Sequence, residues 1–236
     1  MLRPINKIPR SDQVFAQLRD NILTGAYEPG QKLPPERTIC ERMNVNRTSV
    51  REAVKRLQQA KLVRVRQGSG MTVRDYRLHA GLDLIGALLM PAGRLDPDAL
   101  ESVLEMRLLL GPELARLTAE RAEPEEVARL REVVERLESC AAEDAQGIQH
   151  HDFEFHSRLA EASRNLAYLL VVNSIKDLYR EYGELFLAAF EAPFPQRGLY
   201  RRILDAIRAG QPERAHRLDR ELLLQTNARI RESLGL

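Results

Sequence analysis

The sequence has few of the features that mark secreted or membrane proteins. Its two cysteines, Cys40 and Cys140, lie far apart and make no disulfide framework, so free thiols in a reducing compartment are expected. The longest apolar runs, residues 84–92 and 166–172, fall well short of the roughly 20 residues that a membrane helix needs. The first residues, MLRPINKIPRSD, lack the apolar core of a signal peptide. We therefore expect a cytoplasmic protein with no membrane segment.

The parts of a catalytic centre are also missing. The sequence offers no nucleophile–base pair, no complete set of metal ligands and no phosphate-binding loop. With 236 residues, of which 44% are hydrophobic and 30% charged, the chain can bury a sizeable core in one large domain or two small ones. The composition indicates a folded protein, and the missing catalytic motifs argue against an enzyme.

Acidic residues are scarce in the first third of the chain. Residues 1–77 contain 16 Lys or Arg against 7 Asp or Glu, a net charge of +9, whereas residues 78–236 contain 20 against 27, a net charge of −7. This split predicts two domains with that boundary, a basic one for a polyanion and an acidic one with another purpose. A basic surface without any partner is the alternative that charge alone leaves open.

The basic part shows a specific order of patterns. Apolar residues four apart predict a helix from Ser11 to about Gly25, and Pro34-Pro35 precede a second, short helix. A polar connection, residues 44–46, leads into a third helix with one apolar and one basic face. Alternation around Gly68-Ser69-Gly70 then predicts a small β-hairpin. This is the layout of a winged helix-turn-helix, which inserts a helix into the major groove of DNA.

The run LPPERTICERMNVNRTSVREAVKRLQQAKLVRVRQGSG resembles the N-terminal domain of the GntR family of bacterial transcription regulators, over roughly residues 11–74. The resemblance implies double-stranded DNA as a partner. Arg47 or Arg51 suits bidentate pairing with guanine, and Thr48 and Ser49 at the helix start suit phosphate contacts. The DNA-contacting residues that we expect are Arg37, Asn46, Arg47, Thr48, Ser49, Arg51, Gln67 and Gly68.

The acidic part shows helical patterns only. We expect a mainly α protein, in which the N-terminal winged helix-turn-helix with its β-hairpin wing precedes an all-α bundle of about six to seven helices with room for a cavity. Turn signals divide this part into helical segments near residues 81–90, 97–122, 125–143, 146–163, 166–190, 193–209 and 212–234.

Three segments of the acidic part, EMRLLLGPELA, DFEFHSRLAEASRN and LYRRILDAIRAGQPERA, resemble the C-terminal effector (FCD) domain of the FadR subfamily within the GntR family. The resemblance implies a domain that holds the dimer contact and a ligand cavity, and a ligand that changes how the paired DNA-binding domains are held. A two-fold symmetric homodimer would read a palindromic operator.

The stretch HHDFEFH raises the question of a metal site. Many members of the subfamily hold a divalent metal such as zinc with an Asp-x-x-x-His pair, which Asp152 and His156 match, and two further histidines. Tyr200 and Leu222 stand where those histidines are expected, and two donors make a weak site. We therefore expect the pair to serve the cavity by hydrogen bonding, to each other or to Arg107. A metal held with substitute donors is the alternative, the candidates being Glu221 and His216.

The expected ligand is an acidic metabolite. Residues 166–190 resemble the fatty-acid-responsive branch of the subfamily, and the apolar Leu222 and Leu223 favour an acyl tail, as in fatty acyl-CoA. A small carboxylic or sugar acid, held by a metal or by Arg107, is the alternative, although an internal pair of Arg107 with Asp152 or with a glutamate is equally open. A metal-dependent hydrolase and a DNA-binding protein without ligand are more distant alternatives. The expected effector-binding residues are Arg107, Asp152, His156, Asn173, Tyr179, Tyr200, Leu223 and Thr226.

Overall fold

A computed structural model describes residues 9–66 and 68–236. The described residues form two compact units, which divide between Asp96 and Pro97. The boundary between them falls later than the one predicted after residue 77, because Leu84 and Ala87 pack into the hydrophobic core of the first unit. The apolar run that begins at Leu84 therefore completes the basic unit, although it resembles the helical patterns of the acidic part.

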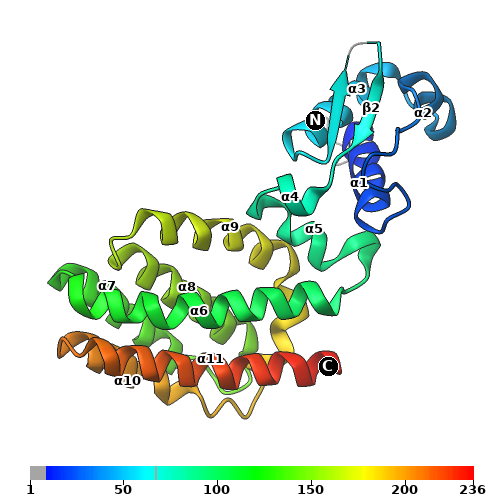
Figure 1. The fold of residues 1–236 in the computed structure, drawn as a ribbon. Helices are drawn as coiled ribbons and strands as arrows, with labels where there is room; N and C mark the ends of the chain where they lie inside the picture. Colours follow the sequence, from blue (N-terminus) through cyan, green and yellow to red (C-terminus); the bar gives the residue numbers. More distant parts are fainter. Residues whose placement is uncertain (1–8, 67) are drawn as a thin grey trace, which may run out of the picture. The chain divides into compact units, whose positions relative to one another are not determined.

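The first unit is built around three helices, α1 (Arg10–Leu23), α2 (Glu36–Met43) and α3 (Arg47–Gln59) (Figure 1). The antiparallel strands β1 (Val63–Arg66) and β2 (Gly70–Val73) follow as a hairpin. One apolar stripe from each element forms the core, which explains the four-residue and two-residue periodicities of the sequence. The unit ends with α4 (Tyr76–His79), η1 (Leu82–Leu84), α5 (Ile85–Leu89) and η2 (Pro91–Gly93).

Glycine is required at the turn of the hairpin. Gly68 and Gly70 have φ angles of +77° and +83°, in the left-handed region that other residues rarely adopt. The predicted contact residue Gln67 lies outside the described residues. On its other edge β2 pairs with the segment before α2, where the amide of Leu33 donates to the carbonyl of Met71 at 2.9 Å and Lys32 bridges to Thr72. The two-stranded wing is therefore extended at one edge by a single β-bridge.

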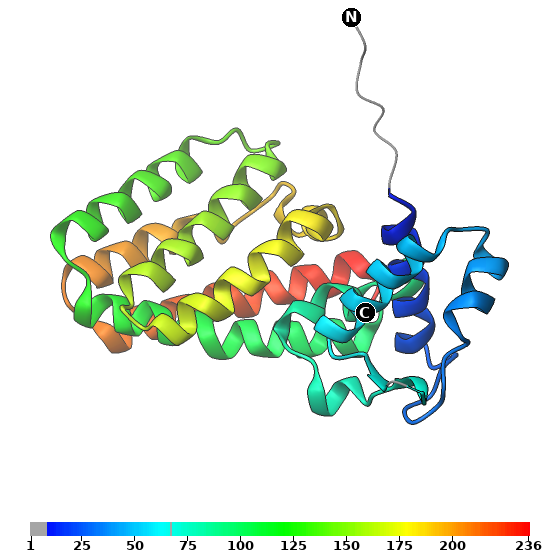
Figure 2. The same cartoon turned by 90° about the horizontal axis from the view of Figure 1, so that it is seen from above.

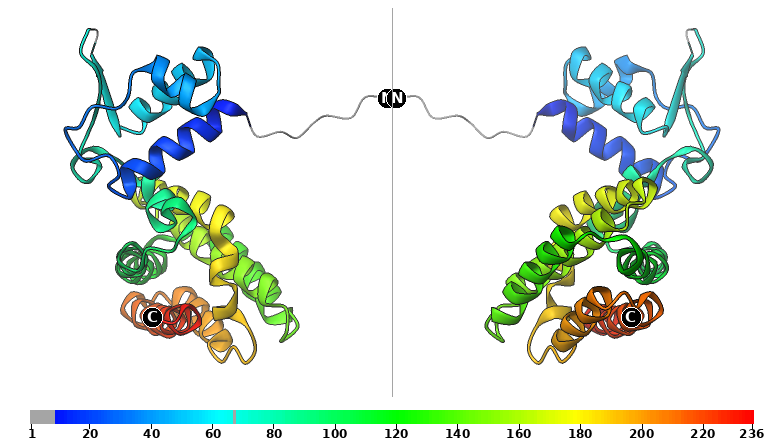
Figure 3. Two further views of the ribbon diagram at one scale, coloured as in Figure 1. Left: turned by 90° about the vertical axis from the view of Figure 1, so that its right-hand side faces the viewer. Right: turned by 90° about the vertical axis from the view of Figure 1, so that its left-hand side faces the viewer.

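The second unit is all-helical among its described residues, and the mainly α fold with a two-stranded wing is confirmed. Figures 1 and 2 show the first and last of its helices side by side, and Figure 3 views them nearly end-on. The segment expected as one helix over 166–190 is divided at Gly183. Among the described residues, no helix combines the length and apolar character of a membrane span. The elements are α6 (Pro97–Arg121), α7 (Pro124–Ser139), α8 (Ala145–Ala162), α9 (Leu166–Tyr182), η3 (Gly183–Phe190), α10 (Arg197–Arg208) and α11 (Pro212–Leu234).

Candidate functional site

Helix α3 presents the residues that the sequence predicts as DNA contacts. The side chain of Asn46 caps the helix by accepting a hydrogen bond from the amide of Ser49 at 2.8 Å. Arg47, Thr48 and Arg51 are exposed, because the opposite stripe of the helix is buried in the core. Asn46 therefore has a structural role in addition to the predicted one.

Two of the predicted DNA-contacting arginines rest against acids of the short helix α2. Arg51 pairs with Glu36 at 3.1 Å, and Arg37 pairs with Glu41 at 3.7 Å. The arginine side chains are 69% and 78% exposed, so these pairs are weak and a phosphate or base can displace the acid. The arrangement keeps both guanidinium groups extended at the surface.

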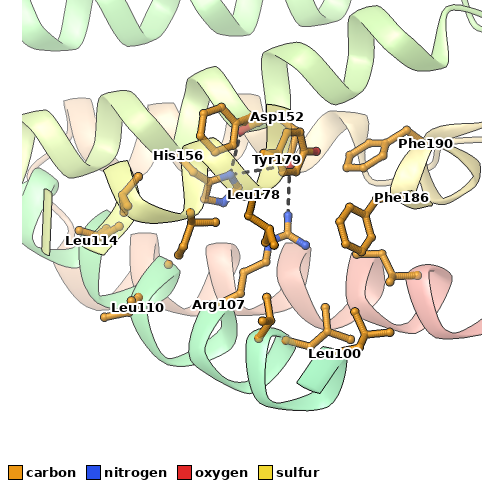
Figure 4. A pocket seen from close by; sticks show the side chains of 17 residues that line it. Leu100, Arg107, Leu110, Leu114, Asp152, His156, Leu178, Tyr179, Phe186 and Phe190 are labelled. Carbon is orange, nitrogen blue, oxygen red and sulfur yellow. Dashed lines mark hydrogen bonds and ion pairs between the residues drawn. The ribbon is translucent and has the colours of Figure 1, made fainter. Parts of the chain in front are cut away.

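The second unit encloses a cavity of about 100 Å³ between α6, α8, α9, η3 and α11. Figure 4 shows Arg107 of α6 reaching toward Asp152 and His156 of α8, with Phe186 and Phe190 at one side. Almost all of the remaining lining is apolar, and it includes Leu100, Leu104, Leu114, Val172, Leu178 and Ile230. The cavity therefore combines a long apolar wall with one polar cluster.

Asp152 is the centre of the polar cluster. It is only 2% exposed, and its carboxylate accepts from the guanidinium of Arg107 at 3.1 Å and from the hydroxyl of Tyr200 at 2.7 Å. Arg107 also donates to the side-chain oxygen of Asn227 of α11 at 3.1 Å. Burial, and then the charge of Asp152, raises the pKa of Tyr200 well above its ordinary value, so this hydroxyl stays protonated and donates.

His156 joins two carboxylates from different helices. Its Nδ1 lies 2.9 Å from the backbone carbonyl of Asp152 and 3.5 Å from its carboxylate, and its Nε2 lies 3.3 Å from the fully buried carboxylate of Asp219. Burial alone lowers the pKa of His156, but the two carboxylates outweigh it and raise the pKa above 6.5. Gly111 makes room for this approach, since a Cβ there would lie 2.8 Å from Asp219 and would also clash with Leu223.

Tyr179 of α9 carries a buried hydroxyl at the edge of the cluster. Its ring stacks on Phe153 with a centroid separation of 4.7 Å, and its hydroxyl has no hydrogen-bond partner among the described residues. Burial raises the pKa of Tyr179 far above its ordinary value, so the group remains a neutral donor. An unpaired buried hydroxyl costs free energy that a ligand atom placed beside it would recover.

Four of the residues predicted to bind the effector line the cavity together, namely Arg107, Asp152, His156 and Tyr179. Tyr200 does not line the cavity, but its hydroxyl donates a hydrogen bond to Asp152. The other three do not line the cavity: Leu223 and Thr226 are buried in α11, and Asn173 is exposed on α9.

Sequence reasoning missed Asp219 and Asn227. Both fall within the apolar stripe of α11, whose other buried members are Ala215, Leu218, Leu222, Leu223, Thr226 and Ile230. An aspartate on such a stripe must find a partner inside the protein, and this signal was present in the sequence.

The polar cluster does not fit a divalent metal. Both oxygens of Asp152 are engaged by Arg107 and Tyr200, and residue 222 is a buried leucine without a donor atom. The buried Nε2 of His156 and both carboxylate oxygens of Asp219 have no hydrogen-bond partner in the described part of the chain, but these two residues are fewer donors than a closed metal site uses. The substitute donor Glu221 is exposed and accepts from the side chain of Gln225. In the described part of the chain, three potential metal ligands lie close together only at His150, His151 and Glu154 of α8.

Comparison with known proteins agrees with both units. Residues 10–73 match the model of the bacterial regulatory proteins of the gntR family, and residues 102–225 match that of the FCD domain. The HTH-type transcriptional regulator Mce2R of Mycobacterium tuberculosis is 36% identical over 229 residues, which are 97% of this chain and 95% of that protein. The chain belongs to the GntR family. It is a transcriptional regulator with a DNA-binding and a metabolite-sensing domain, and it is not an enzyme.

Two more distant proteins also match most of the chain. The fatty acid metabolism regulator protein of Erwinia tasmaniensis is 27% identical over 194 residues, which are 82% of this chain and 79% of that protein. A solved structure of Lar, which controls the agr system of Listeria monocytogenes, superposes with a TM-score of 0.61 at 14% identity and covers 98% of this chain and 99% of that one. The latter likeness shows the fold alone. The resemblance to the FadR-like regulators that the sequence indicates is confirmed.

Proposed function

We propose that this GntR regulator binds a palindromic operator as a homodimer, and that a metabolite with an acyl chain, such as fatty acyl-CoA, controls the binding from the cavity of the second unit. The observation that carries the proposal is the lining of that cavity, which is apolar except for one cluster of charges that balance one another. The name of the Erwinia relative agrees with a ligand of this class.

The balance of charges in the cavity decides which part of the ligand can enter it. Arg107 neutralises Asp152, and His156 neutralises Asp219 when it is protonated. The sum of the four charges is zero, or −1 when His156 is neutral, so an added carboxylate would be an uncompensated buried anion. An alkyl chain and its uncharged thioester carry no such penalty. The phosphate groups of CoA would then stay outside the cavity.

This balance argues against the alternative ligand, a small carboxylic or sugar acid held through a divalent metal. Such a ligand needs a positive site, and neither the donor set nor Arg107 provides one, because the guanidinium is already paired with Asp152 and hydrogen-bonded to Asn227. The apolar wall would also remain empty beside a small polar acid.

The cavity must widen to take a long chain, since about 100 Å³ is less than the several hundred Å³ of typical ligand sites. Helix α9 is the wall that can move at least cost, because Val172 and Leu178 are its buried residues over 17 positions. The neighbouring wall, formed by η3, is held more firmly, because the guanidinium of Arg229 donates hydrogen bonds to the carbonyls of Ala189, Glu191 and Pro193. Displacement of α9 is thus the expected structural response to the ligand.

Exposed leucines on the second unit support a dimer. Leu109 of α6 is 74% exposed, and Leu166 and Leu170, one turn apart on α9, are 70% and 57% exposed. Large apolar side chains in such positions are typical of surfaces that another protein covers. If α9 both borders the cavity and joins the protomers, a ligand that displaces it changes the spacing of the two DNA-binding units.

The proposal is tested by selecting duplexes from a randomised pool and footprinting the winners. The expected result is protection of two inverted half-sites by a species that sediments as a dimer, with dissociation of that dimer in the variant L166E/L170E. Footprints over a single half-site by a monomer would contradict the dimeric reading. A thermal-shift panel of acyl-CoAs and organic acids tests the ligand, because a ligand that binds only the folded state raises its melting temperature.

A further inference from the structure

The face of α8 that is turned away from the cavity carries two histidines and a glutamate. His150 and Glu154 are four residues apart and His151 and Glu154 three apart, so the three side chains lie together on one face of the helix. Asp152 and His156, which line the cavity, lie on the opposite face. We call His150, His151 and Glu154 the outer triad. It is separate from the polar cluster of the cavity and has no part in the proposed ligand site.

The donor atoms of the outer triad lie close together. One ring nitrogen of each histidine and one carboxylate oxygen of Glu154 lie within 4.8 Å of one another. Zinc binds such ligands at about 2.0–2.2 Å, so two donors on one ion lie no more than about 4.4 Å apart. Small rotations of the side chains bring the three donors within this limit, because His150 is exposed and free to turn. The backbone of α8 therefore already places three donors around one point.

Two arginines orient the carboxylate of Glu154 through one of its oxygens. Arg136 of α7 donates to Oε1 at 2.8 Å, and Arg158 lies 3.7 Å from the same atom. The other oxygen, Oε2, faces His151, whose Nδ1 lies 3.3 Å away. Burial raises the pKa of Glu154, but Arg136 and His151 outweigh it and lower the pKa, so the group is an anion at neutral pH. A metal ion would meet a charged oxygen that neighbouring side chains already hold in position.

The same arginines decide which kind of cation the outer triad can hold. Their charges oppose a further cation beside Glu154, so electrostatic attraction alone does not fill the site. Binding must come from the two imidazole nitrogens, which suit zinc, copper and nickel. Mg²⁺ and Ca²⁺ take mainly oxygen donors and would gain little here.

We propose that the outer triad binds a zinc ion, or another late first-row transition metal ion, with water completing its coordination. The exposure of His150 leaves room for the water ligands and for exchange of the ion with solution. An ion held by side chains of adjacent turns ties those turns together, so it stabilises α8 in its helical form. The other face of this helix carries Asp152 and His156, so the ion would also stabilise that wall of the cavity.

Isothermal titration calorimetry with zinc chloride alone tests the proposal on the full chain, prepared without a histidine tag. The wild type should bind one Zn²⁺ per chain, and H150Q/H151Q should bind none over the same range of concentration. E154Q should bind more weakly than the wild type, because it replaces a charged ligand by a neutral one. Magnesium chloride should give no binding. Circular dichroism should show the same helix content in all of these proteins, since the substituted side chains lie outside the core.

The matched controls are H216Q, which removes a half-buried imidazole from α11, and H156Q, which removes the imidazole of the cavity. Both should keep the stoichiometry of the wild type. Loss of binding in H156Q would place the ion in the cavity and overturn the proposal. Unchanged binding in H150Q/H151Q, the result expected of an adventitious ion, or no binding in the wild type would overturn it as well.

Thermal melting gives a second readout. Zinc should raise the melting temperature of the wild type but not that of H150Q/H151Q, because an ion that binds only the folded helix stabilises it. An equal rise in both proteins would show that zinc acts at other residues and would overturn the proposal. Operator binding in the absence of zinc tests the proposed function separately, so the two can fail independently.

Discussion

The two units use arginine in opposite ways. In the first unit Arg64 and Arg66 are exposed and form no ion pair with another described residue, and Arg51 is held only by a surface acid. In the second unit Arg107 lies beside a cavity and is matched to Asp152, a carboxylate that is 2% exposed. An exposed cation can exchange its partner for a phosphate at little cost, whereas a cation paired with a buried carboxylate cannot leave it without a larger loss of stability. The first arrangement suits a polyanion, and the second suits a ligand that brings no charge.

The largest expected effect is the loss of the buried partner. D152A leaves the guanidinium of Arg107 and the hydroxyl of Tyr200 without their acceptor, so the free energy of unfolding should fall by about 3 kcal/mol. Urea unfolding followed by circular dichroism measures it. The double variant R107M/D152L should be more stable than D152A, because it leaves no uncompensated charge. A loss below about 1 kcal/mol in D152A would show that the pair is not structurally important.

Removing an exposed arginine of α3 should weaken DNA binding and leave stability almost unchanged. We expect R51A to weaken operator binding by about 1–3 kcal/mol, roughly 5- to 150-fold, with little change in the free energy of unfolding. Fluorescence anisotropy on a labelled duplex gives the affinity. The control E36Q removes only the acid that pairs with Arg51, and it should leave binding unchanged or make it tighter. A stability loss in R51A as large as that of D152A would erase the contrast between the units.

The buried histidine predicts a pH dependence of a definite sign. Because the pKa of His156 in the folded protein is raised above 6.5, its contribution to stability is full below that value and is lost as pH rises through the folded pKa. The free energy of unfolding should therefore decline from about pH 6.5 upward, and H156Q should flatten this part of the profile. The exposed His150 supplies the matched control, H150Q. A wild-type profile that rises over this range would contradict the assignment.

The smallest expected effect concerns a half-exposed pair of the second unit. Glu138 of α7 hydrogen-bonds Arg201 of α10, which lowers the pKa of the Glu138 carboxyl. Its contribution is present above the unfolded pKa and is lost as pH falls through the folded one, and it amounts to less than about 1 kcal/mol because the groups remain in contact with water. Urea unfolding of E138Q at neutral pH measures it. A loss as large as that of D152A would mean that exposure to water does not determine how much these ion pairs contribute to stability.

Elements that follow from local patterns could be predicted from the sequence. The helices and hairpin of the first unit follow from apolar spacing, paired prolines and the glycines at 68 and 70. The Asp152–His156 pair on one helix face follows from a spacing of four. The approach of Asp219 to His156 does not, because it depends on how α11 crosses α6 at Gly111. The boundary between the two units could not be predicted either, because apolar periodicity does not tell which core a segment such as 84–92 will join.

The balance of charges in the cavity can be tested by a single titration. Operator affinity is measured by anisotropy with no ligand, with palmitoyl-CoA below its critical micelle concentration, with palmitate, and with citrate. Palmitoyl-CoA should change the affinity by about 5- to 150-fold, the usual range of coupling between two sites, whereas palmitate and citrate should leave it unchanged. An equal or larger change with either free acid would contradict this expectation, because a carboxylate would then be accepted beside Asp152 and Asp219.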